Sequence, residues 1–259
     1  MKRILREQHG PICRLVLNEP AKRNALSSAM IAALQSALDD AIAEPTIRVI
    51  IIAANGPAFS AGHDLKEISQ GQAEATGELV SLFKNCNALM LAIANAQKPI
   101  IAEVDGIATA AGCQLVAQCD LAVASDTSRF ATPGAGIGLF CSTPSVPLTR
   151  AVSQKAAMEM LLTADPVSAD QALAIGLINR VVAAEELGAA TMALANRISE
   201  HPPEVLALGK RTVRAHANQS LAEAYEIAGQ AMVENLTFDA AKEGIAAFIE
   251  KRPPDWKPT

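Results

Sequence analysis

The segment Lys98–Asp120, KPIIAEVDGIATAAGCQLVAQCD, carries most of the information about the fold. An apolar run of the β type breaks into small residues and then opens into a helical pattern. Pro57–Leu65, PAFSAGHDL, repeats this design. Small residues let a ligand approach the backbone, and the first turn of a helix has N–H groups without intrahelical partners. Two such turns facing each other could hold a developing oxyanion between two N–H donors.

Strand and helix patterns alternate through the first 131 residues, which predicts stacked α/β units. The predicted strands are Ile12–Asn18, Ile47–Ala53, Ile100–Val104, Leu121–Ala124 and Arg129–Ala131, and the predicted helices are Ser27–Glu44, Glu78–Ala96 and a short one after Gly112. From Ser153 onward the pattern is mostly helical. The helices expected there are Ala156–Leu162, Ala169–Ile175, Ala184–Ser199, Glu204–Ala217, Leu221–Asn235 and Asp239–Lys251, with a short strand at Ile178–Val182.

The composition is that of a globular protein, with 50% apolar and 19% charged residues among 259. A net charge of −5 and only 3% aromatic residues argue against a nucleic-acid surface. No apolar run is long enough to cross a bilayer. The five cysteines form no metal-type pair, so we expect no metal site and reduced thiols in the cytoplasm. The mitochondrial matrix is the alternative if a presequence has been removed.

Several motifs, in order along the chain, resemble the crotonase, or enoyl-CoA hydratase/isomerase, superfamily. They are LNEPAKRNALS (Leu17–Ser27), the two segments above, FATPGAGIGLF (Phe130–Phe140) and the closing EGIAAFIEKRPPDW. The resemblance implies an α/β fold, a crotonase-like spiral of ββα repeats over residues 1–195 that binds acyl-CoA. It also implies a C-terminal helical region over residues 196–259 that makes a homotrimer or a dimer of trimers.

The resemblance assigns the two oxyanion donors to the backbone N–H groups of His63 and Ala111. Together they would polarise a thioester C=O and stabilise an enolate, a contribution of about 3–4 kcal/mol per donor. The alternative is two ordinary helix starts. We expect the His63 side chain to point to solvent or to cap its own turn. A titrating group beside the thioester is the alternative for this imidazole.

The chain departs from the family's hydratases at both acid/base carboxylates. The first glutamate is replaced by Gln114, and the second, which follows a proline, by Gly134. An amide cannot transfer protons near neutral pH, and glycine has no side chain to do so. We therefore expect Gln114 to hydrogen-bond the substrate or a water. We also predict that Gln114→Glu combined with Gly134→Glu would restore some hydration. A group within the family that also lacks these carboxylates matches the stretch Asp105–Ser125.

Replacement acids or bases would have to come from elsewhere. Glu103, Asp105 and Asp120 are carboxylates near strand ends, and we expect each of them to be structural. Cys141 and Ser142 follow Gly-Leu-Phe in a loop that lies near the thioester in some family members. We expect Cys141 to be a packing thiol, with a nucleophile as the alternative.

The resemblance places the adenine of coenzyme A (CoA) against backbone groups of Ala61, Asp64 and Leu65. It assigns Arg23 to the phosphates and Lys251 to the adenosine phosphate, often across a subunit contact. The alternative for both basic residues is a solvated surface charge. An apolar tunnel for the acyl chain is expected to be lined by Leu79, Leu82, Phe83 and Leu139, and the alternative is that these residues belong to the core.

The resemblance, together with these residues, implies an acyl-CoA-processing enzyme whose backbone oxyanion hole stabilises a thioester enolate without two glutamates. No cofactor is expected, because the CoA thioester is itself the substrate. The alternatives are a non-catalytic acyl-CoA-binding or regulatory protein, and a thioester decarboxylase or hydrolase.

Overall fold

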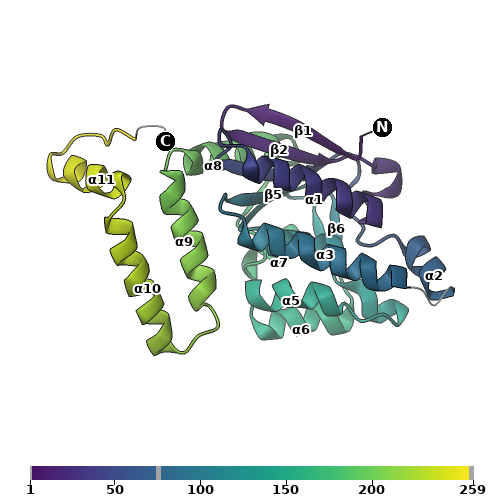
Figure 1. The fold of residues 1–259 in the computed structure, drawn as a ribbon. Coiled ribbons are helices and arrows are strands. Elements are labelled where there is room, and N and C mark those ends of the chain that lie inside the picture. Colours follow the sequence, from purple (N-terminus) through teal and green to yellow (C-terminus); the bar gives the residue numbers. More distant parts are fainter. Residues whose placement is uncertain (1, 74–76, 257–259) are drawn as a thin grey trace.

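The computed structural model describes residues 2–73 and 77–256, and its described part contains two sheets (Figure 1). The larger sheet has the order β1-β2-β3-β5-β7-β10, and only β1 runs antiparallel to its neighbour. Its strands are β1 (Ile4–His9), β2 (Ile12–Leu17), β3 (Val49–Ala54), β5 (Ile100–Val104), β7 (Leu121–Ser125) and β10 (Arg180–Val182). The smaller sheet, in spatial order, contains β4 (Ala58–Ser60), β6 (Ile107–Thr109), β8 (Arg129–Ala131) and β9 (Val167–Ser168).

Consecutive strands step from the larger sheet to the smaller one and then enter a helix. The steps are β3 to β4, β5 to β6 and β7 to β8, and the paired strands among these six run parallel. The helices that follow are α2 (Leu65–Ala73) and α3 (Gly77–Asn95), then α4 (Ala111–Gln118), then the 3-10 helix η2 (Pro133–Ile137) and α5 (Ser142–Ala151). This repetition is the expected spiral of ββα units.

Burial on both faces explains why the strands of the larger sheet are nearly continuous apolar runs. One face packs against α1 (Ser28–Ala43) and α3, and the other against α8 (Leu187–Ser199). Helix α1 begins where the Ser27 hydroxyl accepts a hydrogen bond from the Met30 N–H. Its buried stripe includes Met30, Leu34 and Leu38.

The C-terminal helices form an arm that stands away from the spiral (Figure 1). The arm, as we use the term, comprises α9 (Pro203–His216), α10 (Leu221–Leu236) and α11 (Asp239–Ile249). Helix α10 packs on α9 and has no buried residue. The expected boundary after residue 195 falls inside α8. Met1 and residues 257–259, the outer ends of the two expected segments, lie outside the described residues. Among the described residues, no helix is long and apolar enough to span a bilayer.

Several elements differ from the sequence predictions. Strand β1 was not predicted, because its sequence ILREQH is polar and one of its faces is largely open. Helix α5 was not predicted either, because it contains Pro147 and is rich in hydroxyl residues. The predicted helix Ala184–Ser199 begins as a 3-10 turn, η3 (Ala184–Glu186). The remaining elements are η1 (Pro20–Lys22), α6 (Gln154–Thr163) and α7 (Ala169–Ala174).

Candidate active site

Two strand-to-helix turns meet side by side at one edge of the smaller sheet. Strands β4 and β6 are parallel neighbours, with Ser60 paired to Ala108. Both strands end there, and the chain then enters α2 and α4. Because parallel strands end at the same edge, the first turns of both helices are brought together there.

The backbones of the two turns approach so closely that glycine is required on each side. A Cβ atom placed on Gly62 would lie 2.8 Å from the Ala110 Cβ and 3.1 Å from the Ala111 backbone nitrogen. A Cβ atom on Gly112 would lie 2.3 Å from the Ser60 carbonyl oxygen. No L side chain fits at either point without a shift of the backbone.

The backbone N–H groups of His63 and Ala111 make no hydrogen bond within the described part of the chain. Ala111 is the first residue of α4, where such donors lack an intrahelical partner. Ala110 precedes it with φ 50° and ψ −117°, a conformation that L residues rarely adopt. Strain of this kind persists where surrounding contacts hold it, and the Ala110 N–H donates to the Ala131 carbonyl at 2.9 Å.

A cavity of about 370 Å³ opens beside the two turns. Its apolar lining includes Leu65, Ile68, Phe83, Ile137, Leu139 and Phe140. Of the four residues predicted for an acyl tunnel, Phe83 and Leu139 line this cavity. Leu82 is instead in the buried core, and Leu79 packs against Gly71. Ile137 and Phe140 were missed, although their apolar side chains in a glycine-rich loop were a usable signal.

The two positions that lack glutamate have different surroundings. Gly134 lines the cavity, and a Cβ atom on it would lie 1.9 Å from the Leu139 carbonyl oxygen and 2.9 Å from the Cys141 sulfur. The prediction that glutamate at position 134 would restore hydration therefore needs correction, because the loop leaves no room for a side chain. Gln114 is buried and does not line the cavity, and its Oε1 has no hydrogen-bond partner among the described residues.

The His63 side chain does not follow the expectation that it points to solvent or caps its own turn. Its Nδ1 lies 3.0 Å from the Leu26 carbonyl oxygen, and its ring packs edge-on against Phe83 with centroids 5.3 Å apart. The turn is tied to Leu26 a second time, because the Leu26 N–H donates to the Gly62 carbonyl at 2.7 Å. Burial lowers the pKa of His63, so the ring is neutral at pH 7.

The three other carboxylates are structural, as expected. Glu103 accepts a hydrogen bond from Arg14 at 2.6 Å, and Asp105 accepts one from the Ser125 hydroxyl at 2.8 Å. Asp120 accepts the Ile100 N–H at 2.8 Å and pairs with two cations of the arm. None of the three lines the cavity.

Cys141 lines the cavity and ends the loop that precedes α5, as expected, whereas Ser142 is the first residue of that helix. The Cys141 sulfur accepts a hydrogen bond from the Gly134 N–H at 3.3 Å. Burial raises the pKa of Cys141, which leaves it a thiol at neutral pH and argues against a nucleophile. All five cysteines are free. No group of side chains suited to a metal ion occurs among the described residues.

The residues assigned to CoA fall into two groups. Ala61 and Leu65 line the cavity, and Asp64 between them accepts the Lys66 N–H at 3.0 Å. The Ala61 N–H already donates to the Arg23 carbonyl at 2.9 Å, so its carbonyl is the group left for a ligand. Arg23 is exposed on the adjoining η1 turn.

Lys251 is not brought to the cavity within one chain. It follows α11 at the far end of the arm, whereas α2 lies at the opposite end of the molecule (Figure 1). Any contact between Lys251 and a ligand in this cavity would therefore come from another copy of the chain.

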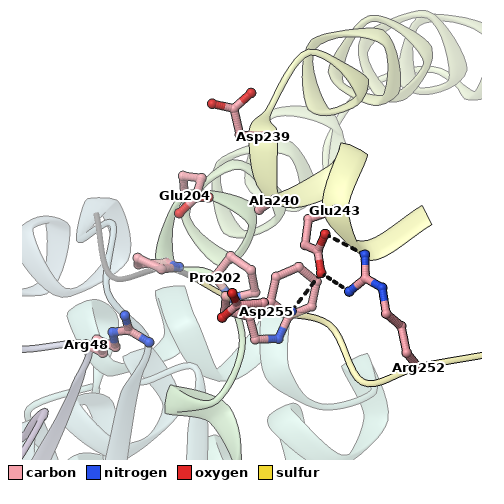
Figure 2. A pocket seen from close by; sticks show the side chains of 10 residues that line it. Arg48, Pro202, Glu204, Asp239, Ala240, Glu243, Arg252 and Asp255 are labelled. Atoms are coloured by element: carbon pink, nitrogen blue, oxygen red, sulfur yellow. Dashed lines mark hydrogen bonds and ion pairs between the residues drawn. The ribbon is translucent and has the colours of Figure 1, made fainter. Parts of the chain in front are cut away.

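A larger cavity, of about 660 Å³, lies between the arm and the spiral and shares no lining residue with the first (Figure 2). Its walls carry several charged side chains, and Figure 2 shows Arg252 directed at Glu243. The Asp255 N–H also donates to Glu243, at 2.7 Å. These contacts hold the C-terminal tail against α11 and give this cavity a structural role.

Comparison with known proteins agrees with this architecture. The family model described as enoyl-CoA hydratase/isomerase matches residues 7–259. The mitochondrial enoyl-CoA hydratase domain-containing protein 3 of Mus musculus is 51% identical over 97% of this chain and 83% of its own length. The crystal structure of the human protein of that name has a TM-score of 0.93 at 48% identity and covers 98% of this chain and 100% of its own. An enoyl-CoA hydratase from Mycobacterium smegmatis also has a TM-score of 0.93, at 46% identity over 98% of both chains. The chain therefore belongs to the enoyl-CoA hydratase/isomerase, or crotonase, superfamily, and within it resembles the domain-containing protein 3 group.

Proposed function

We propose that this protein binds an acyl-CoA thioester and stabilises its enolate between the backbone N–H groups of His63 and Ala111. The observation that carries the proposal is the close contact of the two turns, which leaves both donors without a partner beside the apolar cavity. Two fixed donors directed at one oxygen favour the enolate over the neutral thioester, because the oxygen gains negative charge.

The absence of carboxylates argues against the two-glutamate hydration of other family members. No Asp or Glu of the described residues lines the cavity, and the wall at Gly134 leaves no space for one. This observation also favours the second candidate function, a non-catalytic acyl-CoA-binding or regulatory protein. Decarboxylation of a malonyl-type thioester needs an enolate but no strong base, and it is a third candidate for the same geometry.

Binding of the CoA portion is proposed to use the backbone around Ala61, Asp64 and Leu65, with Arg23 near the phosphates. Lys251 would join from a neighbouring copy, which requires a trimer or a dimer of trimers. The arm supports this assembly, because α10 buries none of its residues within one chain. No cofactor is required, since the CoA thioester supplies the reacting group. The mitochondrial names of the similar proteins support the matrix as the compartment, rather than the cytoplasm expected first.

The first test compares hexanoyl-CoA with hexyl-CoA, a thioether of the same chain length that lacks the carbonyl oxygen. We expect the thioester to bind about 10–100-fold more tightly by calorimetry, because two hydrogen bonds are gained. Equal affinity would contradict the oxyanion proposal. Incubation with crotonyl-CoA, a 3-enoyl-CoA and a malonyl-type CoA then separates the candidates. Turnover of any one excludes a pure binding protein, whereas stabilisation against heat without turnover favours it.

A further inference from the structure

The imidazole of His63 is held in one tautomer by its surroundings. A carbonyl oxygen can only accept a hydrogen bond, so Nδ1 carries the proton that it donates to Leu26. In this neutral tautomer Nε2 carries no proton, and its lone pair can accept one. The contact between the Leu26 N–H and the Gly62 carbonyl fixes the backbone from which the ring projects.

Nε2 of His63 is one of four buried side-chain polar atoms without a partner in the described residues, and a second is Oε1 of Gln114. His63 lines the cavity, whereas Gln114 is buried in α4 and does not line it. A buried acceptor without a partner costs about 1–3 kcal/mol and is uncommon, so its presence calls for an explanation. The explanation favoured here is a substrate that supplies the missing partner.

The cavity offers few other groups that could move a proton. Among its described lining residues, the ionisable side chains are His63 and Cys141. Cys141 is a poor base at neutral pH, because burial keeps it protonated. The imidazole is thus the available base in a site where both family glutamates are replaced.

We propose that His63 is a catalytic residue of this enzyme, with its backbone N–H holding the thioester oxygen and its Nε2 removing a proton from the acyl α-carbon. This inference rests on the proposed function and names the base that the function lacks. The Nε2 lone pair forms the new N–H bond, and the electrons of the broken C–H bond form a C=C bond to the carbonyl carbon. The carbonyl π electrons move to the oxygen, which is then the enolate held by the two N–H groups. The imidazolium exchanges this proton with water that enters with the substrate, and return of a proton or deuteron to the α-carbon reverses each change.

The charges around the ring support a neutral base. Glu67, from α2, raises the pKa of His63, and burial opposes it with the larger effect. The Glu67 carboxylate is turned toward α1, where it accepts the Ser28 N–H at 3.0 Å. Asp64 is engaged with the Lys66 N–H, and Cys141 across the cavity is uncharged. Nε2 has almost no exposed surface in the free protein, so the cavity wall must shift before substrate and water reach it. Phe83, which packs edge-on against the ring, belongs to that wall. Catalytic hydrogen bonds often form only in the substrate complex.

The test is exchange of the α-protons of hexanoyl-CoA with D2O, followed by mass spectrometry. In His63→Asn the side-chain nitrogen matches Nδ1 and keeps the bond to Leu26, but no atom replaces Nε2. In His63→Gln an acceptor reaches the Nε2 position without its basicity. We expect both variants to lose at least about 100-fold in exchange rate. His9→Gln, at an exposed histidine of β1, should exchange like the original protein.

The pH profile gives an independent readout. Exchange that depends on neutral His63 should level off at neutral pH and above and should fall at acidic pH, because burial lowers the pKa of His63 below its ordinary value of 6.5. Exchange caused by hydroxide would instead rise with hydroxide concentration throughout. If His63→Asn still exchanged the α-protons, the assignment of His63 would be overturned. The oxyanion proposal would stand in that case, provided that the variant and the unsubstituted protein both bind the thioester more tightly than the thioether. If the unsubstituted protein binds the thioester more tightly but exchanges no α-protons, the assignment of His63 is also overturned. Loss of the thioester preference in the original protein would overturn both proposals.

Discussion

The two turns that border the cavity are tightly packed within the chain, whereas the helices of the arm leave much of their surface exposed. At the turns, a single methyl group on Gly112 would come within 2.3 Å of a backbone oxygen. On α10, no residue is buried, and on α11 Phe248 is 86% exposed. The turns are therefore specified by contacts within the chain, whereas the arm presents apolar surface that the single chain does not use.

The proposed function has two parts, stabilisation of the oxyanion and binding of CoA. The first depends on contacts within one copy of the chain, and the second depends partly on contacts between copies. The oxyanion donors and His63 depend on backbone contacts that one copy makes by itself. Lys251, which lies at the end of the arm, can reach a bound ligand only between copies. Substitutions at the turns should therefore reduce stability and binding together. Substitutions on the exposed face of the arm should instead affect assembly, and CoA binding through it, with little effect on the stability of one chain.

The largest effect is expected for Gly112→Ala. The added methyl group meets the Ser60 carbonyl, which belongs to a strand and cannot move away independently. We expect a loss of about 3 kcal/mol in the free energy of unfolding, and loss of the preference for a thioester over a thioether. Denaturant unfolding and calorimetry measure the two quantities.

Gly188→Ala provides the matched control for this change. Gly188 lies in α8, and nothing is found within 4 Å of a Cβ atom placed there. Alanine should stabilise this helix by about 0.5–1 kcal/mol. Equal effects of the two substitutions would contradict the view that close backbone contact specifies the turns.

An intermediate effect is expected for Asp120→Asn at the joint between the spiral and the arm. Asp120 pairs with Lys210 at 2.6 Å and with Arg214 at 3.0 Å. Burial lowers the pKa of Lys210, and Asp120 opposes this shift. Without the carboxylate, the buried ammonium keeps its hydrogen bonds to the Ile93 and Lys98 carbonyls but loses its negatively charged partner, and we expect a loss of about 2 kcal/mol in the free energy of unfolding.

A second substitution identifies the source of that loss. Adding Lys210→Met to Asp120→Asn should recover part of the stability, because the unpaired charge is removed as well. The control is Asp239→Asn, which breaks an exposed ion pair with Lys242 and should leave unfolding unchanged. If Asp120→Asn and Asp239→Asn lowered the free energy of unfolding by similar amounts, burial of the ion pair at the joint would not explain its contribution to stability.

Much of the fold could be predicted from local sequence signals. The Ser27 cap and Pro45 bracket α1 within one residue of its observed bounds, and the apolar run of β5 was predicted in full. Strand β4 was missed because it has three residues and depends on pairing with β6, a contact remote in sequence. Helix α5 was missed because tertiary packing overrides the unfavourable Pro147.

The site was predictable in position but not in its details. The resemblance assigned residues 63, 111, 114 and 134 to the site, and the structure brings the turns that carry the first two into contact, while their role as oxyanion donors stays a prediction. The direction of the His63 ring depends on the Leu26 carbonyl, which is 37 residues away along the chain. The lack of space at Gly134 depends on how the loop folds back to Leu139. Neither contact leaves a local pattern in the sequence.

The smallest effect on unfolding is expected for the arm variant Tyr225→Glu with Phe248→Glu, which tests the other side of the contrast. Both side chains are largely exposed, so charged replacements that favour helices should change the unfolding free energy of a dilute monomer by less than about 0.5 kcal/mol.

Assembly should respond strongly to the same two substitutions, because a buried interface does not accept unpaired carboxylates. Light scattering is expected to show a trimer or hexamer for the original protein and a monomer for the variant. Leu162→Glu, at another exposed apolar position, on α6, should keep the assembly. Loss of the arm contacts should also weaken CoA binding, since Lys251 would no longer reach a neighbouring site, while a preference for thioester over thioether should persist. A monomeric original protein, or an arm variant that unfolds on its own, would mean that the arm is specified within the chain like the turns.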